Sequence, residues 1–315
     1  MRDDVIPGPH PDPTVDPRPA SGGSERVDAA VAGPAMAAFR DSLALPPDLD
    51  ARGGVVDDLA THYGFSPDEV VERCRGWVEH SVEEWGSSAR ETNEDIFDFY
   101  RTNVSWAFDV LWYAYLQAEL YSYPVSVAIA DDLPAGSLRH LDFGSGTGVT
   151  SQMMVRLGHR SDMADIATGM LEFARFRHTR RGDEVRSIDL NDETLGEDVY
   201  DVITAIDTLV HIPNLADACR TLHAALRPDG LLYANFDVRP DGPENAPHLY
   251  EDDLPLRRLL QRTGFVPEAS IDGMVVRYRR VDPTTLEHRV RVVRDALMLG
   301  PVRRTVRFAR RVLRR

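Results

Sequence analysis

Three alternate glycines near the middle of the chain form a turn suited to holding a ligand. Gly144, Gly146 and Gly148 follow the apolar segment 139–143, which reads as a strand, and they precede a helix-forming segment. Glycines at such a turn let the backbone adopt positive φ and approach a bound group closely, and the N–H groups of the first helical turn face outward. Asp142 stands just before the turn, where its carboxylate would attract a cation and repel a pyrophosphate.

Acidic residues also end the next segments that read as strands. Asp165 closes an apolar run 17 residues after the last of these glycines, and Asp189 and Asp207 close the two strand-like runs that follow. The alternation of strands and helices predicts an α/β fold with a parallel sheet wrapped by helices. At the carboxyl edge of such a sheet an acidic side chain can accept both ribose hydroxyls of an adenosine. Acids at strand ends also cap helices and bind water, so the prediction rests on the joint pattern.

The spacing of the glycines indicates which ligand the turn holds. A dinucleotide-binding turn reads G-x-G-x-x-G, whereas residues 144–148 read G-x-G-x-G. Preceded by Asp142, this turn resembles motif I of the class I S-adenosylmethionine-dependent methyltransferases of the small-molecule type. The resemblance extends over residues 136–237. It implies a Rossmann-like seven-stranded sheet with an antiparallel last strand, helices on both faces and an N-terminal helical cap.

Two further stretches are similar to segments of that family. The segment LVHIPN at 209–214 looks like the "LEHVPD" that follows the fourth strand, with Val210 in place of the glutamate and His211 at the family position. The segment LRPDG at 226–230 precedes a fifth apolar strand, residues 231–236, as it does in the family.

The resemblance implies S-adenosylmethionine as cofactor and assigns residues to it. Asp142 and Gly144 would hold its methionine part, and Asp165 its ribose. Ile166 would cover one adenine face, and Asp189 would meet the adenine amino edge. The full set implied for the cofactor is Asp142, Gly144, Ser145, Gly146, Gly148, Asp165, Ile166, Met170, Asp189 and Leu190.

Methyl transfer from a sulfonium requires an acceptor atom held in line and, where needed, a base. His211 follows the fourth strand and would face the methyl group in this topology, where an imidazole can take a proton from a hydroxyl or an amine. Asp207 is the second candidate. A histidine at this place could equally hydrogen-bond a loop carbonyl. No metal is required, and the sequence shows no cluster of metal ligands, since Cys74 and Cys219 are isolated.

Aromatic residues are concentrated ahead of the sheet. Residues 97–123 hold ten of the 25 aromatic side chains in the chain. They could form a packing layer over one side of the sheet, or line an apolar acceptor pocket above the cofactor, and both can hold. The resemblance favours a cap at residues 25–135 that supplies this pocket. The residues assigned to the acceptor are Tyr100, Trp106, Tyr113 and Tyr121, with His248 and Tyr250 from a long polar loop.

The rest of the chain divides around these two parts. Residues 1–24 are rich in proline, glycine and aspartate and predict a disordered leader. Ser66-Pro67-Asp68-Glu69 marks the start of a helix that should run to about Trp85, and Asn93 should cap the next helix. Two β-rich runs, 266–271 and 274–281, meet at Asp272-Gly273 and predict a hairpin. We expect these runs to be the antiparallel sixth and seventh strands of a methyltransferase sheet, and the domain to cover residues 136–282.

Charge and hydropathy limit the partners. The net charge of −15 argues against a general nucleic-acid binder, and the chain lacks the apolar run of a membrane span or a signal peptide, so we expect a cytoplasmic protein. Residues 283–315 are arginine-rich and predict a basic amphipathic tail. Such a helix could pack on the acidic protein itself, lie on an anionic membrane or hold an acidic partner.

Two functions from different classes follow from these features. The first is methyl transfer to an oxygen or nitrogen, less readily a carbon, of a small molecule such as a natural-product intermediate. The alternative is a methyltransferase-like interaction protein that docks to a membrane or an acidic partner through its arginine-rich tail. A nicotinamide-dependent oxidoreductase would need the G-x-G-x-x-G turn that the chain lacks. A homodimer remains open.

Overall fold

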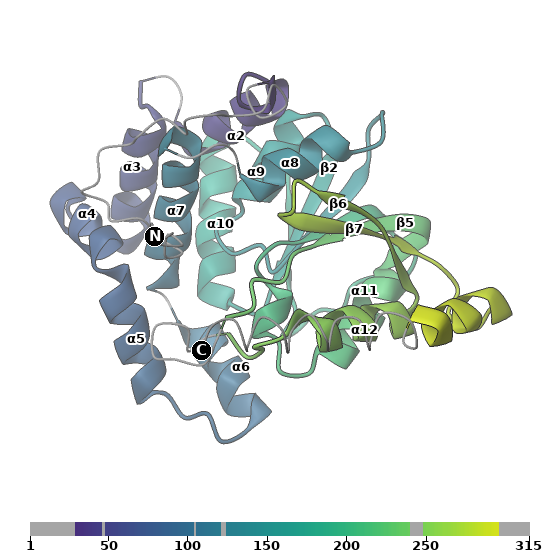
Figure 1. The fold of residues 1–315 in the computed structure, drawn as a ribbon. Helices are drawn as coiled ribbons and strands as arrows, with labels where there is room; N and C mark the ends of the chain where they lie inside the picture. The colour runs from purple at the N-terminus through teal and green to yellow at the C-terminus, as the bar shows by residue number, and fades with distance from the viewer. Residues whose placement is uncertain (1–28, 46–47, 104, 121–123, 240–247, 296–315) are drawn as a thin grey trace, which may run out of the picture.

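A computed structural model describes residues 29–45, 48–103, 105–120, 124–239 and 248–295 of the 315-residue chain. A twisted sheet occupies one half of the molecule, and the helices that precede it along the chain form the other half (Figure 1). The predicted leader, Tyr121 and the tail beyond residue 295 lie outside the described residues.

The sheet has seven strands in the order β3-β2-β1-β4-β5-β7-β6. Their bounds are β1 Arg139–Phe143, β2 Arg160–Asp165, β3 Arg186–Asp189, β4 Tyr200–Ala205, β5 Leu226–Ala234, β6 Phe265–Ile271 and β7 Val275–Arg280. β1 pairs in parallel with both β2 and β4, so the strand order reverses between β1 and β4. In open α/β sheets the crevice beyond the carboxyl ends of the strands at such a reversal is where ligands bind.

The predicted antiparallel last strand is confirmed, with one correction. β7 is antiparallel to both β5 and β6, so β7 alone among the described strands runs against the others, and β6 shares their direction. Asp272 and Gly273 both have positive φ, 50° and 73°. The hairpin loop also includes Met274, whose N–H donates to the carbonyl of Ile271 at 3.0 Å. The second strand therefore begins at Val275, one residue later than expected.

Helices before the sheet form the cap. Their bounds are α2 Pro34–Leu43, α3 Ala51–Tyr63, α4 Pro67–Arg75, α5 Trp77–Ser87, α6 Asn93–Thr102, α7 Trp106–Leu120 and α8 Val125–Asp132. The helices within the second half are α9 Val149–Arg156, α10 Thr168–Arg181, α11 Leu215–Ala225 and α12 Asp253–Thr263, with a 3-10 turn η1 at Leu209–His211. In Figure 1, α8 and α9 lie on one side of the sheet and α11 and α12 on the other, while α10 stands between the sheet and the cap.

The helix expected from Ser66 to Trp85 is two helices. Its start is as predicted, since Ser66 accepts from the N–H of Glu69 and the Glu69 carboxylate accepts from the N–H of Ser66. Gly76 then ends α4 and begins α5, and glycine is about 1 kcal/mol less favourable than alanine in a helix interior. The predicted cap at Asn93 is also shifted by one residue, because Thr92 is the N-cap of α6 and forms a capping box with Asp95.

The fifth strand is longer than the predicted segment 231–236. β5 starts at Leu226 and passes through Pro228-Asp229-Gly230, where its register with β4 shifts. Asp229 has φ +63° at this irregularity. Tyr200 pairs with Leu226 and Val202 with Leu231, so β5 has three more residues than β4 between these paired positions. Residues 228–230 therefore form an irregularity within the strand that does not end the pairing.

Two buried clusters cover the two faces of the sheet. One joins the cap, α9 and residues of α10 to the sheet, and it includes Phe108, Trp112 and Phe173. The other joins α11 and α12 to the opposite face and includes Leu222 and Leu260. Several cap aromatics are thus packing residues, as one of the two interpretations of the aromatic segment predicts.

The described part of the predicted tail is helical at residues 286–295. Among the described residues, no helix is long and apolar enough to cross a bilayer.

Candidate active site

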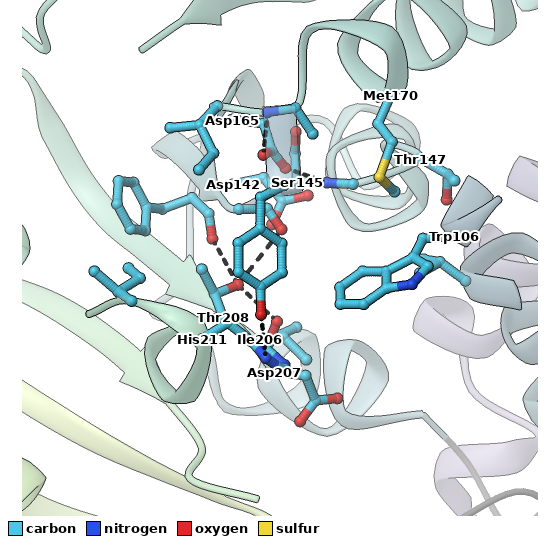
Figure 2. Close-up of a pocket in the computed structure, with 18 of the residues that line it drawn as sticks. Trp106, Asp142, Ser145, Thr147, Asp165, Met170, Ile206, Asp207, Thr208 and His211 are labelled. Atoms are coloured by element: carbon cyan, nitrogen blue, oxygen red, sulfur yellow. Dashed lines mark hydrogen bonds between the residues drawn. The ribbon is translucent and has the colours of Figure 1, made fainter. Parts of the chain in front are cut away.

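A cavity of about 900 Å³ lies between the cap and the carboxyl edge of the sheet. This volume is at the upper end of the range of about 300–1,000 Å³ typical of small-molecule sites. Figure 2 shows Asp142, Ser145 and Asp165 gathered on the sheet side, with Trp106 facing them from the cap and His211 and Asp207 nearby. One cavity is therefore lined by residues from both halves of the site expected from the sequence.

The glycine turn has the backbone conformation that the sequence predicts. Gly144, Gly146 and Gly148 have φ values of 70°, 52° and 74°, in the left-handed region. A Cβ atom on Gly144 would lie 2.2 Å from Cγ2 of Thr208, so the turn packs directly against the segment that follows β4. The N–H of Gly146 donates to Oδ2 of Asp165 at 2.9 Å. These contacts fix the turn at the wall of the cavity.

Asp142 and Asp165 place two carboxyl groups beside this turn. Asp142 is buried and accepts a hydrogen bond from Oγ1 of Thr204 at 2.9 Å. Burial raises the pKa of Asp142 to about 7. Asp165 accepts from the N–H groups of Gly146 and Ala167, and burial raises its pKa as well. Each carboxylate offers about four acceptor positions, so both retain capacity for a ligand.

Ser145 supplies an unsatisfied polar atom at the same place. Its side chain lines the cavity, and its Oγ is buried without a hydrogen-bond partner among the described residues. A buried hydroxyl without a partner is uncommon in a folded protein. A polar ligand in the cavity would satisfy it.

Asp189 does not line the cavity, unlike the other acids assigned to the cofactor. It accepts from Oγ1 of Thr168 at 2.7 Å and from the N–H of Asn191 at 3.0 Å. Partial burial opposes its ionisation, but these hydrogen bonds outweigh it and lower the pKa of Asp189. Leu190 lines the cavity in its place. Ile166 and Met170 line the cavity, whereas Gly148 is the N-cap of α9 and stands outside the wall.

His211 is held at the cavity by aromatic residues of the cap. It ends the η1 turn, and its Nδ1 is hydrogen-bonded to the Tyr100 hydroxyl at 3.1 Å. The ring centroids of Trp106 and His248 lie 6.1 Å and 4.8 Å from that of His211. Trp106 also has an indole Nε1 that is buried without a partner among the described residues.

Asp207, the second candidate base, lies on the same wall. Its φ of 50° is unusual for a residue other than glycine, and its N–H donates to Oδ1 of Asn235 at 2.7 Å. The amide of Asn235 in turn donates to the Asp207 carboxylate. Desolvation by the surrounding protein raises the pKa of the Asp207 carboxyl, although the hydrogen bond with Asn235 acts in the opposite direction. A left-handed backbone held by a side-chain pair often marks a functional position.

The acceptor residues assigned from the sequence are only partly brought together. Tyr100, Trp106, Tyr113 and His248 line the cavity. Tyr250 does not, and its hydroxyl donates to the carbonyl of Ile212 at 2.8 Å.

Several charged residues that line the cavity are absent from the sequence prediction, among them Asp109 and Arg239. Asp109 projects from α7, and burial raises its pKa to about 8 against the opposing attraction of Arg239. Asp109 is three residues after Trp106 and four before Tyr113, so the helical period that groups those two rings could have identified it. Arg239 follows β5 and forms an ion pair with Asp237, and no sequence pattern singled it out. Among the described residues, no group of His, Cys, Asp and Glu is arranged to hold a metal.

Comparison with known proteins identifies the domain that carries the glycine turn. Residues 141–232 match the family model of a methyltransferase domain. The ubiquinone biosynthesis O-methyltransferase of Ruegeria pomeroyi is 32% identical over 105 residues, which are 33% of this chain and 42% of that protein. The protein of the same name from Methylocella silvestris is 35% identical over 106 residues, 32% of this chain and 40% of that protein. The chain spans about two fifths of the length of these relatives.

A solved structure shows a similar but limited match. The S-adenosylmethionine-dependent methyltransferase from Mesorhizobium loti is 21% identical, with a TM-score of 0.40, over 49% of this chain and 96% of that one. The matched family segment of this chain contains the glycine turn, Asp165 and His211. Over this segment the chain is similar to methyltransferase domains.

Proposed function

We propose that this protein transfers the methyl group of S-adenosylmethionine to an oxygen or nitrogen atom of a small molecule. The observation that carries the proposal is the single cavity, because it joins the glycine turn with Asp142 and Asp165 to the aromatic wall of the cap and to His211. A cofactor on the sheet side and an acceptor on the cap side would meet beside His211. In-line displacement requires the acceptor atom to be held next to the methyl group and opposite the leaving sulfur, and this arrangement would allow it.

The residues on the sheet side fit this cofactor. Carboxylates suit an ammonium group and ribose hydroxyls, and Asp142 and Asp165 border the turn that would receive them. The unsatisfied Oγ of Ser145 offers a further polar contact. Ile166 and Met170 supply the apolar wall for an adenine ring. When bound, S-adenosylmethionine supplies a methyl group already activated on a sulfonium.

His211 would act on the acceptor as a general base. A neutral imidazole that takes a proton at Nε2 carries its own hydrogen at Nδ1, and the Tyr100 oxygen 3.1 Å away can accept that hydrogen. The contact would then fix the ring and its tautomer, as the partner of a catalytic histidine commonly does. Asp207 is the alternative base on the same wall.

The cap would set the type of acceptor. Tyr100, Trp106 and Tyr113 present aromatic surface, and the Trp106 Nε1 offers one donor to an oxygen of the acceptor. The curated relatives are called O-methyltransferases, which supports a hydroxyl as the acceptor group. We further propose that the substrate is a natural-product intermediate and that the protein is cytoplasmic.

A transfer assay tests this proposal. Purified protein is incubated with S-[methyl-³H]adenosylmethionine and a panel of aromatic compounds that carry hydroxyl or amino groups, and extractable label is counted. Label in an acceptor that disappears in His211→Asn, while the variant still binds S-adenosylhomocysteine, would support both the activity and the base. A variant as active as the wild type would remove His211 from the mechanism.

A further inference from the structure

A fully buried ion pair joins the cap to the methyltransferase domain. The Nε atom of Arg177 in α10 lies 3.0 Å from Oδ2 of Asp58 in α3, and both side chains have 0% exposure. Removing two charges from water is unfavourable unless their geometry and remaining hydrogen bonds compensate. The groups that Arg177 contacts therefore indicate its role.

The Arg177 guanidinium contacts three different segments. Besides the Asp58 carboxylate, Nη2 donates to the carbonyl of Ser42 at the end of α2, at 2.9 Å. Nη1 donates to the carbonyl of Thr147 at 2.7 Å, and Thr147 belongs to the glycine turn and lines the cavity. A planar fork of five N–H donors can serve three such acceptors at once, which a lysine ammonium on a flexible stem cannot do in the same geometry.

The same helix holds the glycine turn at a second point. Nε2 of His178 lies 3.1 Å from Oγ of Ser151, and that hydroxyl donates to the carbonyl of Gly148 at 2.9 Å. Two successive residues of α10 thus fix two successive carbonyls of the turn, one directly and one through Ser151. Because a peptide group is planar, fixing its carbonyl also fixes the direction of its N–H.

We propose that Arg177 is a positioning residue for the cofactor, which pins the glycine turn to the cap through Thr147, Asp58 and Ser42. The inference rests on the proposed function for its link to S-adenosylmethionine. Asp58 and Ser42 do not line the cavity, so cofactor affinity depends here on cap residues that the cofactor does not reach.

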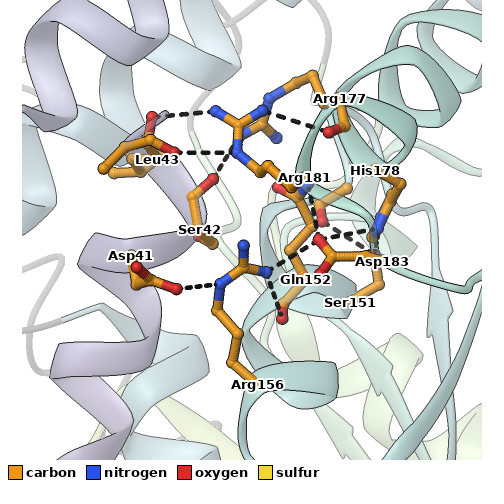
Figure 3. A network of polar contacts seen from close by, with 12 residues as sticks. Asp41, Ser42, Leu43, Ser151, Gln152, Arg156, Arg177, His178, Arg181 and Asp183 are labelled. Atoms are coloured by element: carbon orange, nitrogen blue, oxygen red, sulfur yellow. Dashed lines mark hydrogen bonds and ion pairs between the residues drawn. The ribbon is translucent and has the colours of Figure 1, made fainter. Parts of the chain in front are cut away.

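Arg181 provides a control because it also pairs with Asp58 and hydrogen-bonds the end of α2, but has no hydrogen bond to the turn among the described residues. Figure 3 shows both guanidinium groups against the end of α2. Arg181 is also fully buried and lies 2.7 Å from Oδ2 of Asp58. Its other hydrogen bonds to the cap go to the carbonyls of Leu43 and Ala44, at 3.1 Å each.

The test compares Arg177→Lys with Arg181→Lys, since both substitutions keep a positive charge opposite Asp58. Burial lowers the pKa of Arg177 to about 10, so the native group is charged at neutral pH. Calorimetric titration with S-adenosylhomocysteine should show affinity weakened about tenfold in Arg177→Lys and less than about twofold in Arg181→Lys, as expected for loss of one buried hydrogen bond at the turn. Equal weakening in both variants would overturn the inference, because anchoring of the cap alone would then explain it.

Amide hydrogen exchange without any ligand gives a second measurement. Residues 144–148 should exchange faster in Arg177→Lys than in the wild type and stay unchanged in Arg181→Lys, and unchanged exchange in both would contradict the inference. This exchange measurement tests the role of Arg177 even if the wild type binds no S-adenosylhomocysteine. Absence of binding would contradict the proposed function but not the role of Arg177 at the turn.

The wild type offers a test that does not depend on a variant folding. Saturating S-adenosylhomocysteine should slow exchange at residues 42–45 and around Asp58, although these lie outside the cavity wall. Protection confined to the residues that line the cavity would overturn the coupling between cap and turn.

Discussion

The Tyr100 hydroxyl and Nδ1 of His211 are joined at 3.1 Å, across 111 positions of sequence. Tyr100 belongs to cap helix α6 and His211 follows β4 of the sheet. Burial raises the pKa of Tyr100, so the phenol stays protonated at neutral pH and its oxygen remains a neutral partner for the imidazole. The cap therefore does more than cover the cavity, because it orients the residue proposed as the base.

Removing this contact should slow methyl transfer without weakening the cofactor. Tyr100→Phe leaves the ring but removes the oxygen, and we expect kcat to fall about fivefold to tenfold, the usual effect of one hydrogen bond. His211→Asn should lower kcat by about 10²-fold or more. Tyr200→Phe is the control, because it also removes one buried hydroxyl bond, to Asp162, but lies outside the cavity wall. A Tyr100→Phe enzyme with the kcat of the control would refute the positioning role.

Asp165 should be needed for cofactor binding. Asp165→Ala removes a carboxylate that borders the cavity and also holds the N–H of Gly146. We expect the affinity for S-adenosylhomocysteine to fall about 100-fold, since hydrogen bonds to a charged group contribute about 1.5–3 kcal/mol each. Calorimetry measures the change. Asp162→Ala, in the same strand but outside the cavity wall, should bind as the wild type does, and equal affinities in the two variants would place the cofactor elsewhere.

Gly144 should tolerate no side chain. Gly144→Ala combines a φ of 70° with a Cβ atom 2.2 Å from Cγ2 of Thr208. Gly182→Ala is matched in φ, also 70°, but nothing lies within 4 Å of its Cβ. Chemical denaturation should show a loss of about 1–2 kcal/mol for Gly182→Ala, from the left-handed backbone alone, and a larger loss for Gly144→Ala. Similar losses would mean that the turn can move away from Thr208.

The stability of the protein should depend on pH through Asp109. Burial raises the pKa of this carboxyl to about 8 in the folded protein, whereas an aspartate in the unfolded chain titrates near 3.9. Between these values the folded state binds more protons than the unfolded state, so the free energy of unfolding falls as pH rises.

Comparison with Asp109→Asn isolates this effect. The difference in unfolding free energy between the wild type and the variant should decrease from pH 6.5 to 8, by at most about 1.4 kcal/mol per pH unit, and then level off. The range above pH 6.5 avoids histidines with lowered pKa, whose contribution has the opposite sign. A constant difference across this range would show that Asp109 is ionised throughout.

Local sequence signals made much of the sheet predictable. Glycines at 144, 146 and 148 can signal positive φ from sequence alone, because other residues rarely adopt it. Acidic residues at the ends of apolar runs and the Asp272-Gly273 pair are likewise local signals, for strand ends and for a hairpin. The break at Gly76 was less visible, since an isolated glycine is tolerated within many helices.

Contacts between distant segments were not predictable. Nothing near Arg177 in the sequence indicates that it meets Thr147, Ser42 and Asp58, and arginine side chains are usually exposed. The same holds for Arg239, which reaches the cavity from the segment after β5. The surroundings of Asp189 were not predictable either. Its place at a strand end predicts an adenine contact, and in the structure its carboxylate accepts hydrogen bonds from Thr168 and Asn191 and does not line the cavity.

Calorimetric titration of the purified protein with S-adenosylmethionine and S-adenosylhomocysteine tests the central claim most directly. We expect one site per chain with micromolar affinity, weakened about 100-fold in Asp165→Ala and kept in Asp162→Ala. Binding that both variants share would contradict the assignment of the cavity, and absence of binding in the wild type would contradict the proposed function.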